Sequence, residues 1–301
     1  MKKIIFKKLL MVFAIVLFAN NLFAQEVYIE FNPGYNFSAG GEFSSKDEYI
    51  DNSNGFDYTV NHEVVKGFSF GKGLNLDGTF GVMMNENFGA ELGLSYLLGN
   101  IGGKTKITET DKDYILTMSG GQFVETTDEY EYYANMLRIN PSIVIASDLQ
   151  GINPYAKFGL IIGSGSFNIK CSYENASYDP IEDKIQTNET IMEYKYSGGI
   201  ALGYNASLGA LFELNDVFSL FGEFNMINLS YAPTKGELIT YTEDGEDKLS
   251  DQKTRDRETE FVESYTYDST EPVEESEPRK ELKQKLPFGS FGVNVGLRIR
   301  F

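Results

Sequence analysis

A small set of acidic and basic residues is scattered among Gly, Ser, Asn and Tyr in several short segments of this sequence. In a narrow interior of low dielectric constant such charges are costly unless they pair. The chemistry they permit is therefore ion pairing, or the lining of a polar conduit. The candidates for this ion-pair set are Glu26, Glu30, Glu91, Arg138, Lys157, Glu223, Arg298 and Arg300.

His62 is the single histidine and is suited to acid–base chemistry, because histidine titrates near neutral pH. Asp51, Asp57 and Ser69 lie near it in the sequence, so a catalytic site is one interpretation. No serine elbow or other nucleophile motif accompanies these residues. We therefore predict no catalytic residues and no enzyme, and keep an enzymatic role as an alternative.

Carboxylates gather in Asp244-Gly245-Glu246-Asp247 and in Glu274-Glu275-Ser276-Glu277. Oxygen ligands suit Ca²⁺ and Mg²⁺, but no segment has the spacing of an EF-hand and charge runs are usually solvated. We expect no specific metal site and no cofactor, with loose bridging of ions at a lipopolysaccharide surface instead. The formal net charge of −18 argues against a nucleic-acid partner, which requires a basic surface.

The segment 291–301 shows the kind of element that must position these charges. Its residues alternate between an apolar face and a face of small or polar residues, as in a two-faced strand. The apolar face comprises Phe291, Val293, Val295, Leu297, Ile299 and Phe301. The same alternation recurs at 27–37, 74–84, 88–96, 137–145, 155–163, 200–212 and 218–226.

The connections between these eight segments alternate in length. Short turns are predicted at 85–87, 147–151 and 214–216, and long polar segments at 41–73, 99–130, 167–193 and 232–286. An up-and-down barrel with an even strand count has both chain ends on the side of the short turns. The sequence therefore predicts an all-β fold, an eight-stranded antiparallel up-and-down transmembrane β-barrel with long extracellular loops. Alternation at the flanks of the long segments predicts hairpins that continue above the membrane.

The composition of the second face decides which face points inward. A soluble barrel would be apolar inside and polar outside. Here the second face is too rich in glycine and too poor in charge for a water-facing sheet. An outward arginine such as Arg138 would also cost about 2–4 kcal/mol near the bilayer midplane. We therefore expect apolar side chains toward lipid and the ion-pair set in a narrow lumen.

Closure of the barrel places the first strand beside the last. The expected partners are Glu26 and Glu30 with Arg298 and Arg300, and Glu91 with Arg138 on the adjacent third and fourth strands. Eight strands leave an interior just wide enough for side chains to fill. We predict a packed lumen, with a narrow channel for small solutes as the alternative.

The first 24 residues have the features of a cleaved signal peptide. Lysines precede a short apolar run, and cleavage is expected after Ala24. The apolar run is shorter than the roughly 20 residues that span a bilayer. Residues 25–301 are predicted to form one barrel domain. Cys171, the single cysteine, is expected to be an incidental loop residue and not a reactive thiol.

The chain resembles the small outer-membrane β-barrel family of OmpA-type, OmpX-type and OmpW-type barrels. The resemblance is carried by the leader, by Asn-Phe-Gly-Ala-Glu-Leu-Gly-Leu-Ser-Tyr at 87–96, by Asn-Pro-Tyr-Ala-Lys-Phe-Gly at 153–159 and by the terminal strand. It implies export to the outer membrane of a Gram-negative cell and contact with lipid and lipopolysaccharide. It also implies that the barrel-insertion machinery reads Phe301 as an assembly signal. Barrels of this kind include a lipid A palmitoyltransferase with His, Asp and Ser at its rim, which keeps the enzymatic alternative for His62.

These observations predict an outer-membrane protein with a structural or surface-binding role, such as adhesion. The long acidic extracellular loops would bind an extracellular ligand that the sequence does not identify. A porin-like channel and a lipid-modifying enzyme are the alternatives.

Overall fold

The computed structural model describes residues 26–40, 44–51, 58–65, 68–118, 120–147, 152–266 and 274–301. The predicted signal peptide, residues 1–24, lies outside these ranges, as does Asp57. The fold is nearly all β, as predicted, and the described ranges add only the short helix α2 (Thr254–Arg257) and the 3-10 turn η2 (Leu249–Asp251). None of the described helices is long and apolar enough to cross a bilayer.

Eight strands close into a ring in which each strand pairs antiparallel with the next and the last returns to the first. They correspond to the eight segments predicted from alternation. In order around the ring they are β1 (Glu26–Ser38), β4 (Gly73–Met83), β5 (Phe88–Leu98), β7 (Gly120–Ala146), β8 (Ile152–Asp179), β10 (Ala201–Glu213), β11 (Phe218–Tyr231) and β17 (Ser290–Arg300). Closure leaves the ring without a free strand edge.

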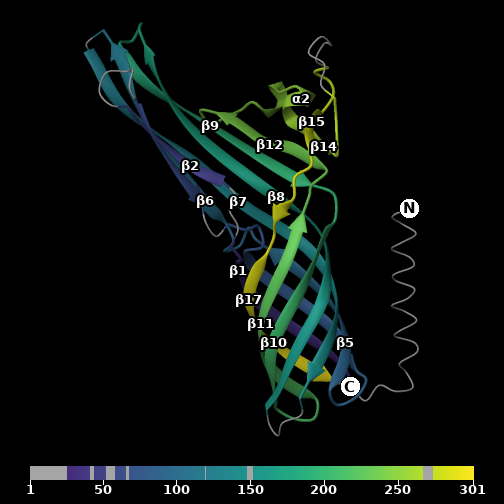
Figure 1. Ribbon diagram of the computed structural model, residues 1–301. Helices are drawn as coiled ribbons and strands as arrows, with labels where there is room; N and C mark the ends of the chain where they lie inside the picture. The colour runs from purple at the N-terminus through teal and green to yellow at the C-terminus, as the bar shows by residue number, and fades with distance from the viewer. Residues whose placement is uncertain are drawn as a thin grey trace.

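Short connections at one end of the ring are built around asparagine side chains. Asn85 Oδ1 accepts hydrogen bonds from the backbone N–H groups of Asn87 and Phe88, and Asn215 Oδ1 does the same for Val217 and Phe218. Asparagine favours such turns because its short side chain mimics a backbone carbonyl. These turns, with the C-terminus, mark the lower end in Figure 1.

The opposite end carries a sheet that rises well above the ring, which we call the outer sheet (Figure 1). It is formed because β7 and β8 are 27 and 28 residues long and continue past the ring. The upper part of β7 pairs with β6 (Thr105–Thr117), and the upper part of β8 pairs with β9 (Lys184–Ser197). Strand β12 (Lys235–Glu243) then adds to β9. The hairpins expected at the flanks of the long segments are present in this sheet.

Further strands extend the outer sheet on both sides, so the count of eight describes the ring alone. A hairpin of β2 (Ser44–Asp51) and β3 (Tyr58–Val65) joins β6 through a parallel pairing of β2. On the other side, β13 (Glu246–Asp247) and β14 (Glu258–Val262) pair with β12, and β15 (Arg279–Leu282) runs parallel to β14. The short β16 (Leu286–Pro287) pairs with the top of β11. The predicted antiparallel arrangement therefore holds for the ring but not for every pairing outside it.

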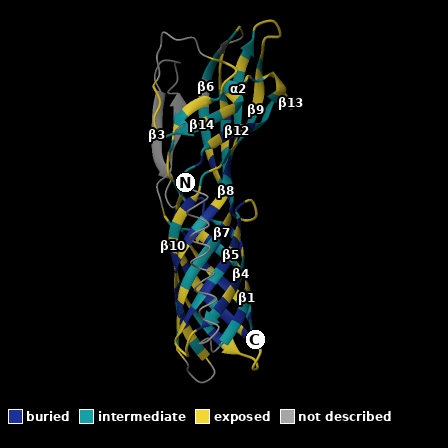
Figure 2. Cartoon of the chain, turned by 90° about the vertical axis from the view of Figure 1, so that its right-hand side faces the viewer, coloured by how far each residue is buried: buried dark blue, intermediate teal, exposed yellow. Residues whose placement is uncertain are grey.

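The ring presents its apolar face outward. Leu208, Leu160 and Phe31 are 67%, 61% and 58% exposed, whereas the alternate positions are buried inside. Figure 2 shows this alternation of buried and exposed residues along the strands of the ring. The expected orientation, with apolar residues outside and small or polar residues inside, is therefore correct.

Candidate functional site

Lys157 is the centre of a buried ionic network in the lumen. Its Nζ atom lies 2.8 Å from Glu30, 3.0 Å from Glu91 and 3.4 Å from Glu223. The three carboxylates come from β1, β5 and β11, and Lys157 comes from β8, so the network ties opposite walls of the ring together. Burial makes each charge expensive, and mutual pairing offsets that cost.

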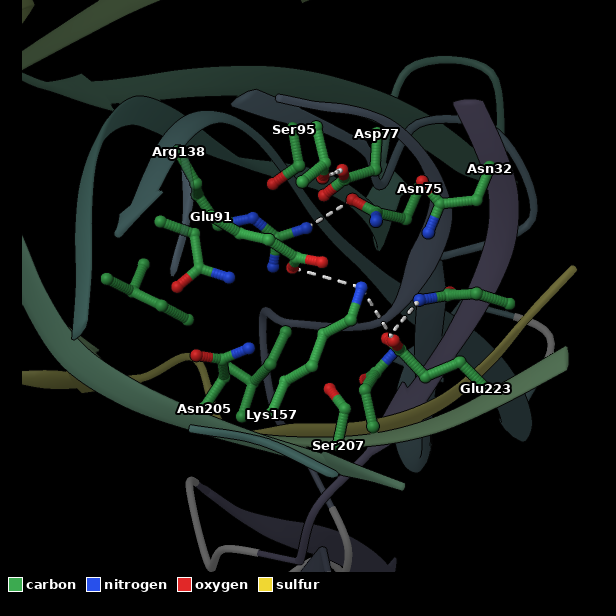
Figure 3. Close-up of a pocket in the computed structure, with 16 residues that line it drawn as sticks. Asn32, Asn75, Asp77, Glu91, Ser95, Arg138, Lys157, Asn205, Ser207 and Glu223 are labelled. Carbon is green, nitrogen blue, oxygen red and sulfur yellow. Dashed lines mark hydrogen bonds and ion pairs between the residues drawn. The ribbon is translucent and has the colours of Figure 1, made fainter. Parts of the chain in front are cut away.

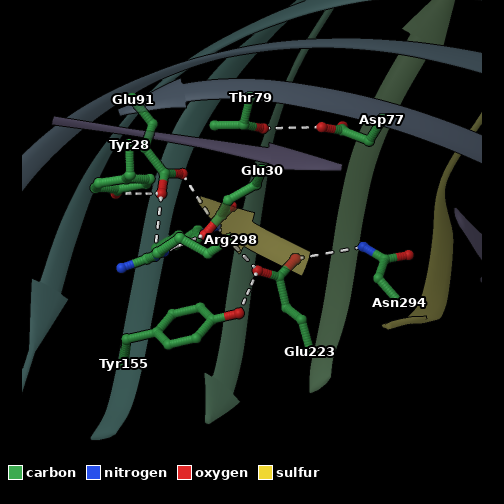
Figure 4. Close-up of polar contacts among 10 residues, drawn as sticks. Tyr28, Glu30, Asp77, Thr79, Glu91, Tyr155, Glu223, Asn294 and Arg298 are labelled. Carbon is green, nitrogen blue, oxygen red and sulfur yellow. Dashed lines mark hydrogen bonds and ion pairs between the residues drawn. The ribbon is translucent and has the colours of Figure 1, made fainter. Parts of the chain in front are cut away.

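Arg298 on β17 completes the network through β1 (Figure 4). Its Nη2 atom lies 2.6 Å from Glu30, its direct neighbour across the closing strand pair. The Arg298 guanidinium also stacks over the ring of Tyr28 at 3.8 Å, and the Tyr28 hydroxyl donates to Glu91 at 2.6 Å. Cation–π stacking and charge-assisted hydrogen bonds hold this set rigidly.

The predicted partners Glu91 and Arg138 each contact a different residue in the structure. Glu91 stands opposite Ser142 and binds Lys157, whereas Arg138 stands opposite Ser95 and donates to Asn75 Oδ1 on β4. The predicted Glu91–Arg138 pair is wrong because sequence alternation gives the face of each residue but not its height in the barrel.

Arg300 lies at the lower mouth and pairs with Glu213 at 2.8 Å, instead of with Glu26 or Glu30. Glu26 and Arg300 both line an open cavity of about 310 Å³ at this mouth. Phe301 follows there, with its N–H donating to Val27 and its side chain 77% exposed. The role of Phe301 as an assembly signal stays a prediction.

Three further inward residues, Tyr28, Tyr155 and Asp77, were not among the candidates predicted from the sequence. Tyr155 donates to Glu223 at 3.2 Å, and Asp77 accepts from Thr79 at 2.9 Å. Their inward parity was the available signal. The carboxylates that accept hydrogen bonds from these tyrosines lie on other strands, so no local sequence pattern could reveal the contacts.

Apolar layers lie above and below the centre of the lumen, while Arg298 of the ionic network also lines the open cavity at the lower mouth. The lower layer is formed by Val144, Tyr155, Leu211 and Phe221. The upper layer, which we call the aromatic cap, contains Phe68, Phe70, Tyr132, Phe167, Tyr231 and Phe288. The rings of Phe70 and Phe167 lie 4.7 Å apart, and those of Phe70 and Phe288 lie 5.4 Å apart.

The aromatic cap is held in place by two segments that approach from opposite ends of the chain. The Phe70 N–H donates to Pro287 at 3.0 Å, and the Ser69 hydroxyl donates to Gly289. Ser69 is 2% exposed and also accepts from the Gly71 N–H. Its hydroxyl is thus engaged in fixing the cap, which gives no support to a nucleophilic role beside His62. His62 itself lies on β3.

Between the layers lies a small cavity of about 50 Å³ (Figure 3). Such a volume holds a few water-sized particles and no organic solute. Its walls are mostly asparagine, serine and the charged groups of the network. The lumen is therefore a packed polar interior between two apolar seals.

The outer sheet has two chemically different faces. The face that continues the inside of the ring, which we call the inner face, carries Tyr130, Tyr132, Ile169, Cys171, Tyr173, Met192, Tyr194 and Tyr196. Tyr130 and Tyr173 meet edge-to-face at 5.7 Å, and Phe167 and Tyr196 stack at 4.6 Å. The reverse face is charged, with Lys104 bound to Glu131 at 2.7 Å.

Cys171 lies inside strand β8 and not in a loop as predicted. It is 5% exposed, and burial raises the pKa of its thiol. A raised thiol pKa lowers the thiolate fraction at neutral pH, which makes the group less nucleophilic.

The acidic clusters of the long segments take part in local structure. Asp244 and Gly245, both with positive φ, form the turn between β12 and β13, and Asp244 Oδ1 accepts from the Glu189 N–H at 2.9 Å. Glu246 pairs with Lys248 at 2.7 Å, and Glu275 pairs with Lys253 at 2.6 Å. Across the described residues, no group of three or more His, Cys, Asp or Glu side chains is arranged to hold a metal ion.

No family model matches the sequence, and no curated protein matches it. Two solved structures match over most of the chain at low similarity. Ail, the attachment invasion locus protein of Yersinia pestis, is 7% identical, with a TM-score of 0.32 over 92% of this chain and 98% of Ail. The outer membrane protease OmpT from Escherichia coli is 10% identical, with a TM-score of 0.34 over 92% of this chain and 97% of OmpT. Scores this low carry no argument about function.

Proposed function

We propose that this protein is an outer-membrane β-barrel that displays a ligand-binding sheet on the cell surface. The observation that carries the proposal is the contrast between the two halves of the molecule. The ring is sealed by two apolar layers and filled by ion pairs, so it serves as an anchor. The outer sheet, by contrast, gathers half-buried aromatic side chains on its inner face, beside the carboxylates of Glu109 and Asp128, and is charged on its reverse face.

The outward apolar belt supports the outer-membrane location. Exposed rows of Leu, Val and Phe cover the ring, which lipid tails would solvate and water would not. Because each ring strand pairs with both of its neighbours, no unpaired backbone edge is left in the hydrocarbon. In outer-membrane barrels the long loops face outward, so the long segments at the end opposite the short turns would lie on the lipopolysaccharide side.

The chemistry of the outer sheet favours a neutral or basic ligand. The formal net charge is −18, and most acidic residues lie in the long segments that build this sheet. Tyrosine rings offer flat apolar surfaces with polar edges, which suit sugars and extended peptides. The solved complex of Ail contains a heparin analogue, but repulsion makes such a polyanion a poor ligand for this acidic surface.

The test compares cells that display the wild-type protein with cells that lack it, on arrays of neutral glycans and of basic peptides. We expect retention on some array members by the wild type, and its loss in the variant Tyr173→Ala/Tyr194→Ala of the inner face. Tyr133→Ala, on the reverse face, is the matched control and should retain binding. Equal retention of displaying and non-displaying cells on all array members would contradict the binding role.

Bilayer conductance tests the anchoring role of the ring. Purified protein in planar bilayers should show no discrete openings, because two apolar layers close the lumen. Reproducible openings by the wild type would favour the narrow channel instead.

A further inference from the structure

The small lumen cavity is lined by an unusual number of side-chain amides. Asn32, Asn140, Asn205, Asn225 and Asn294 border it from five different strands of the ring. The Oδ1 atom of each is buried and has no hydrogen-bond partner among the described residues. Four of these side chains are more than nine-tenths buried, being 4% to 7% exposed.

Unsatisfied buried oxygens on this scale call for an explanation, because buried polar atoms in proteins nearly always have a partner. A single orphan can be accommodated by strain, but five around one cavity share one solution. A small particle that attracts oxygen atoms, held in the cavity, would satisfy these Oδ1 atoms together. Figure 3 shows the side chains of Asn32, Asn205 and Glu223 reaching toward the cavity from different parts of the wall.

The charges of the lumen indicate the sign of that particle. Glu30, Glu91, Glu223 and Asp77 are four carboxylates, and Lys157, Arg298 and Arg138 are three cations. One negative charge therefore remains without an internal counter-charge. An uncompensated charge in a buried interior is costly.

We propose that the lumen cavity binds one monovalent metal cation, of the class of Na⁺ or K⁺. The Oδ1 atoms of Asn205, Asn225 and Asn294 supply neutral oxygen ligands, and the net negative charge of the lumen supplies the attraction. Amide and carboxylate oxygens are the ligands that hard cations prefer. A single positive charge brings the interior to neutrality, whereas a divalent ion would leave an excess of one positive charge.

The cation acts as an internal staple between strands. Asn205, Asn225 and Asn294 come from β10, β11 and β17, which are consecutive around the ring. The folded ring creates the site and the unfolded chain does not, so binding must stabilise the ring by linkage. The stabilisation grows with the logarithm of cation concentration once the site begins to fill.

The experiment measures the unfolding midpoint of the full-length protein in detergent, from the mobility of unheated samples in gels. Samples contain NaCl, KCl or the chloride of N-methylglucamine, an organic cation too large for a 50 Å³ cavity, at equal ionic strength. We expect a higher midpoint in Na⁺ or K⁺ that keeps rising with the logarithm of the cation concentration once the site begins to fill. Identical midpoints in all three salts would overturn the proposal and leave a bound proton as the neutralising charge.

Two variants locate the effect. Glu223→Gln removes the excess negative charge and should abolish the difference between the metal salts and N-methylglucamine. Glu213→Gln removes a carboxylate from the lower mouth, where it pairs with Arg300, and should keep the difference. Loss of the difference in both variants, or in neither, would place the cation elsewhere.

A second measurement uses only the wild type, in case Glu223→Gln does not fold. Crystals grown from protein that is refolded in the presence of thallium(I), a heavy monovalent cation, should show an anomalous peak among the amide oxygens of the cavity. A peak confined to the surface or the lower mouth, or no peak at all, would refute the site.

Discussion

At the scale of single residues, the lumen depends on one lysine that serves three carboxylates. Lys157 is 8% exposed, and its Nζ atom lies within 3.4 Å of a carboxylate oxygen of Glu30, Glu91 and Glu223. Removing one partner of a buried ionic cluster costs more than the pair itself contributes, because the remaining charges stay buried without compensation. Loss of the Lys157 ammonium should therefore strongly destabilise the ring.

Lys157→Met tests this dependence. The substitution keeps the length and apolar stem of the side chain but leaves three carboxylates facing one another. We expect a loss of stability of about 3–5 kcal/mol, measured as a lower unfolding midpoint in detergent. Lys184→Met, which removes an exposed pair with Glu182, is the control and should change little. A wild-type midpoint for Lys157→Met would show that the network is not structural.

At the scale of elements, β7 and β8 join the two halves of the molecule. Each strand begins or ends in the short-turn end of the ring and continues into the outer sheet. The aromatic cap lies where the strands leave the ring, and it receives Tyr132 from β7 and Phe167 from β8. The cap thus seals the lumen and also fixes the direction in which the outer sheet projects.

Phe70→Ala tests the cap as a structural element. Phe70 is 3% exposed, and its ring packs with four other aromatic residues of the cap. Removing a buried phenylalanine typically costs about 3–5 kcal/mol. We expect a lower unfolding midpoint and faster proteolysis of the outer sheet.

Phe123→Ala, on an exposed hairpin position, is the matched control and should leave both measurements unchanged. Equal protease resistance of Phe70→Ala and wild type would mean that the cap does not hold the outer sheet.

At the scale of the whole molecule, the apolar belt and the filled lumen are two consequences of one alternation. The ring strands place large apolar residues outside, and around the middle of the lumen, where eight strands leave little room, they place small or polar residues inside. A protein built this way exposes too much apolar surface to remain in water. The belt therefore predicts insertion into a bilayer.

Leu208→Arg tests the belt. Leu208 lies outward near the middle of β10 and is 67% exposed. An arginine at the bilayer midplane of a barrel costs about 2–4 kcal/mol, so the variant should fold less stably in lipid vesicles. Ile181→Arg, at a 93% exposed tip of the outer sheet, should be neutral. Equal stability of both variants in vesicles would contradict the membrane orientation.

The sequence by itself determined the all-β fold, the eight ring segments and the face on which each residue lies. These properties are local, because the alternation of a strand has a period of two residues and can be read along the chain. The inward position of Glu30, Lys157 and Arg298 followed from this parity. The short turns were also located correctly, because asparagine turns such as those at Asn85 and Asn215 are local as well. The upper ends of β7 and β8 were not, because both strands continue far beyond the predicted 137–145 and 155–163.

Only the tertiary structure decided which inward residues meet. Glu91 binds Lys157 and not Arg138, and Glu30 receives both Lys157 and Arg298, because strand register and tilt set the height of each side chain in the barrel. The aromatic cap likewise required Phe70 and Phe288 to approach from opposite ends of the chain. Contacts of this kind depend on closure of the ring, which brings together residues that no short stretch of sequence relates.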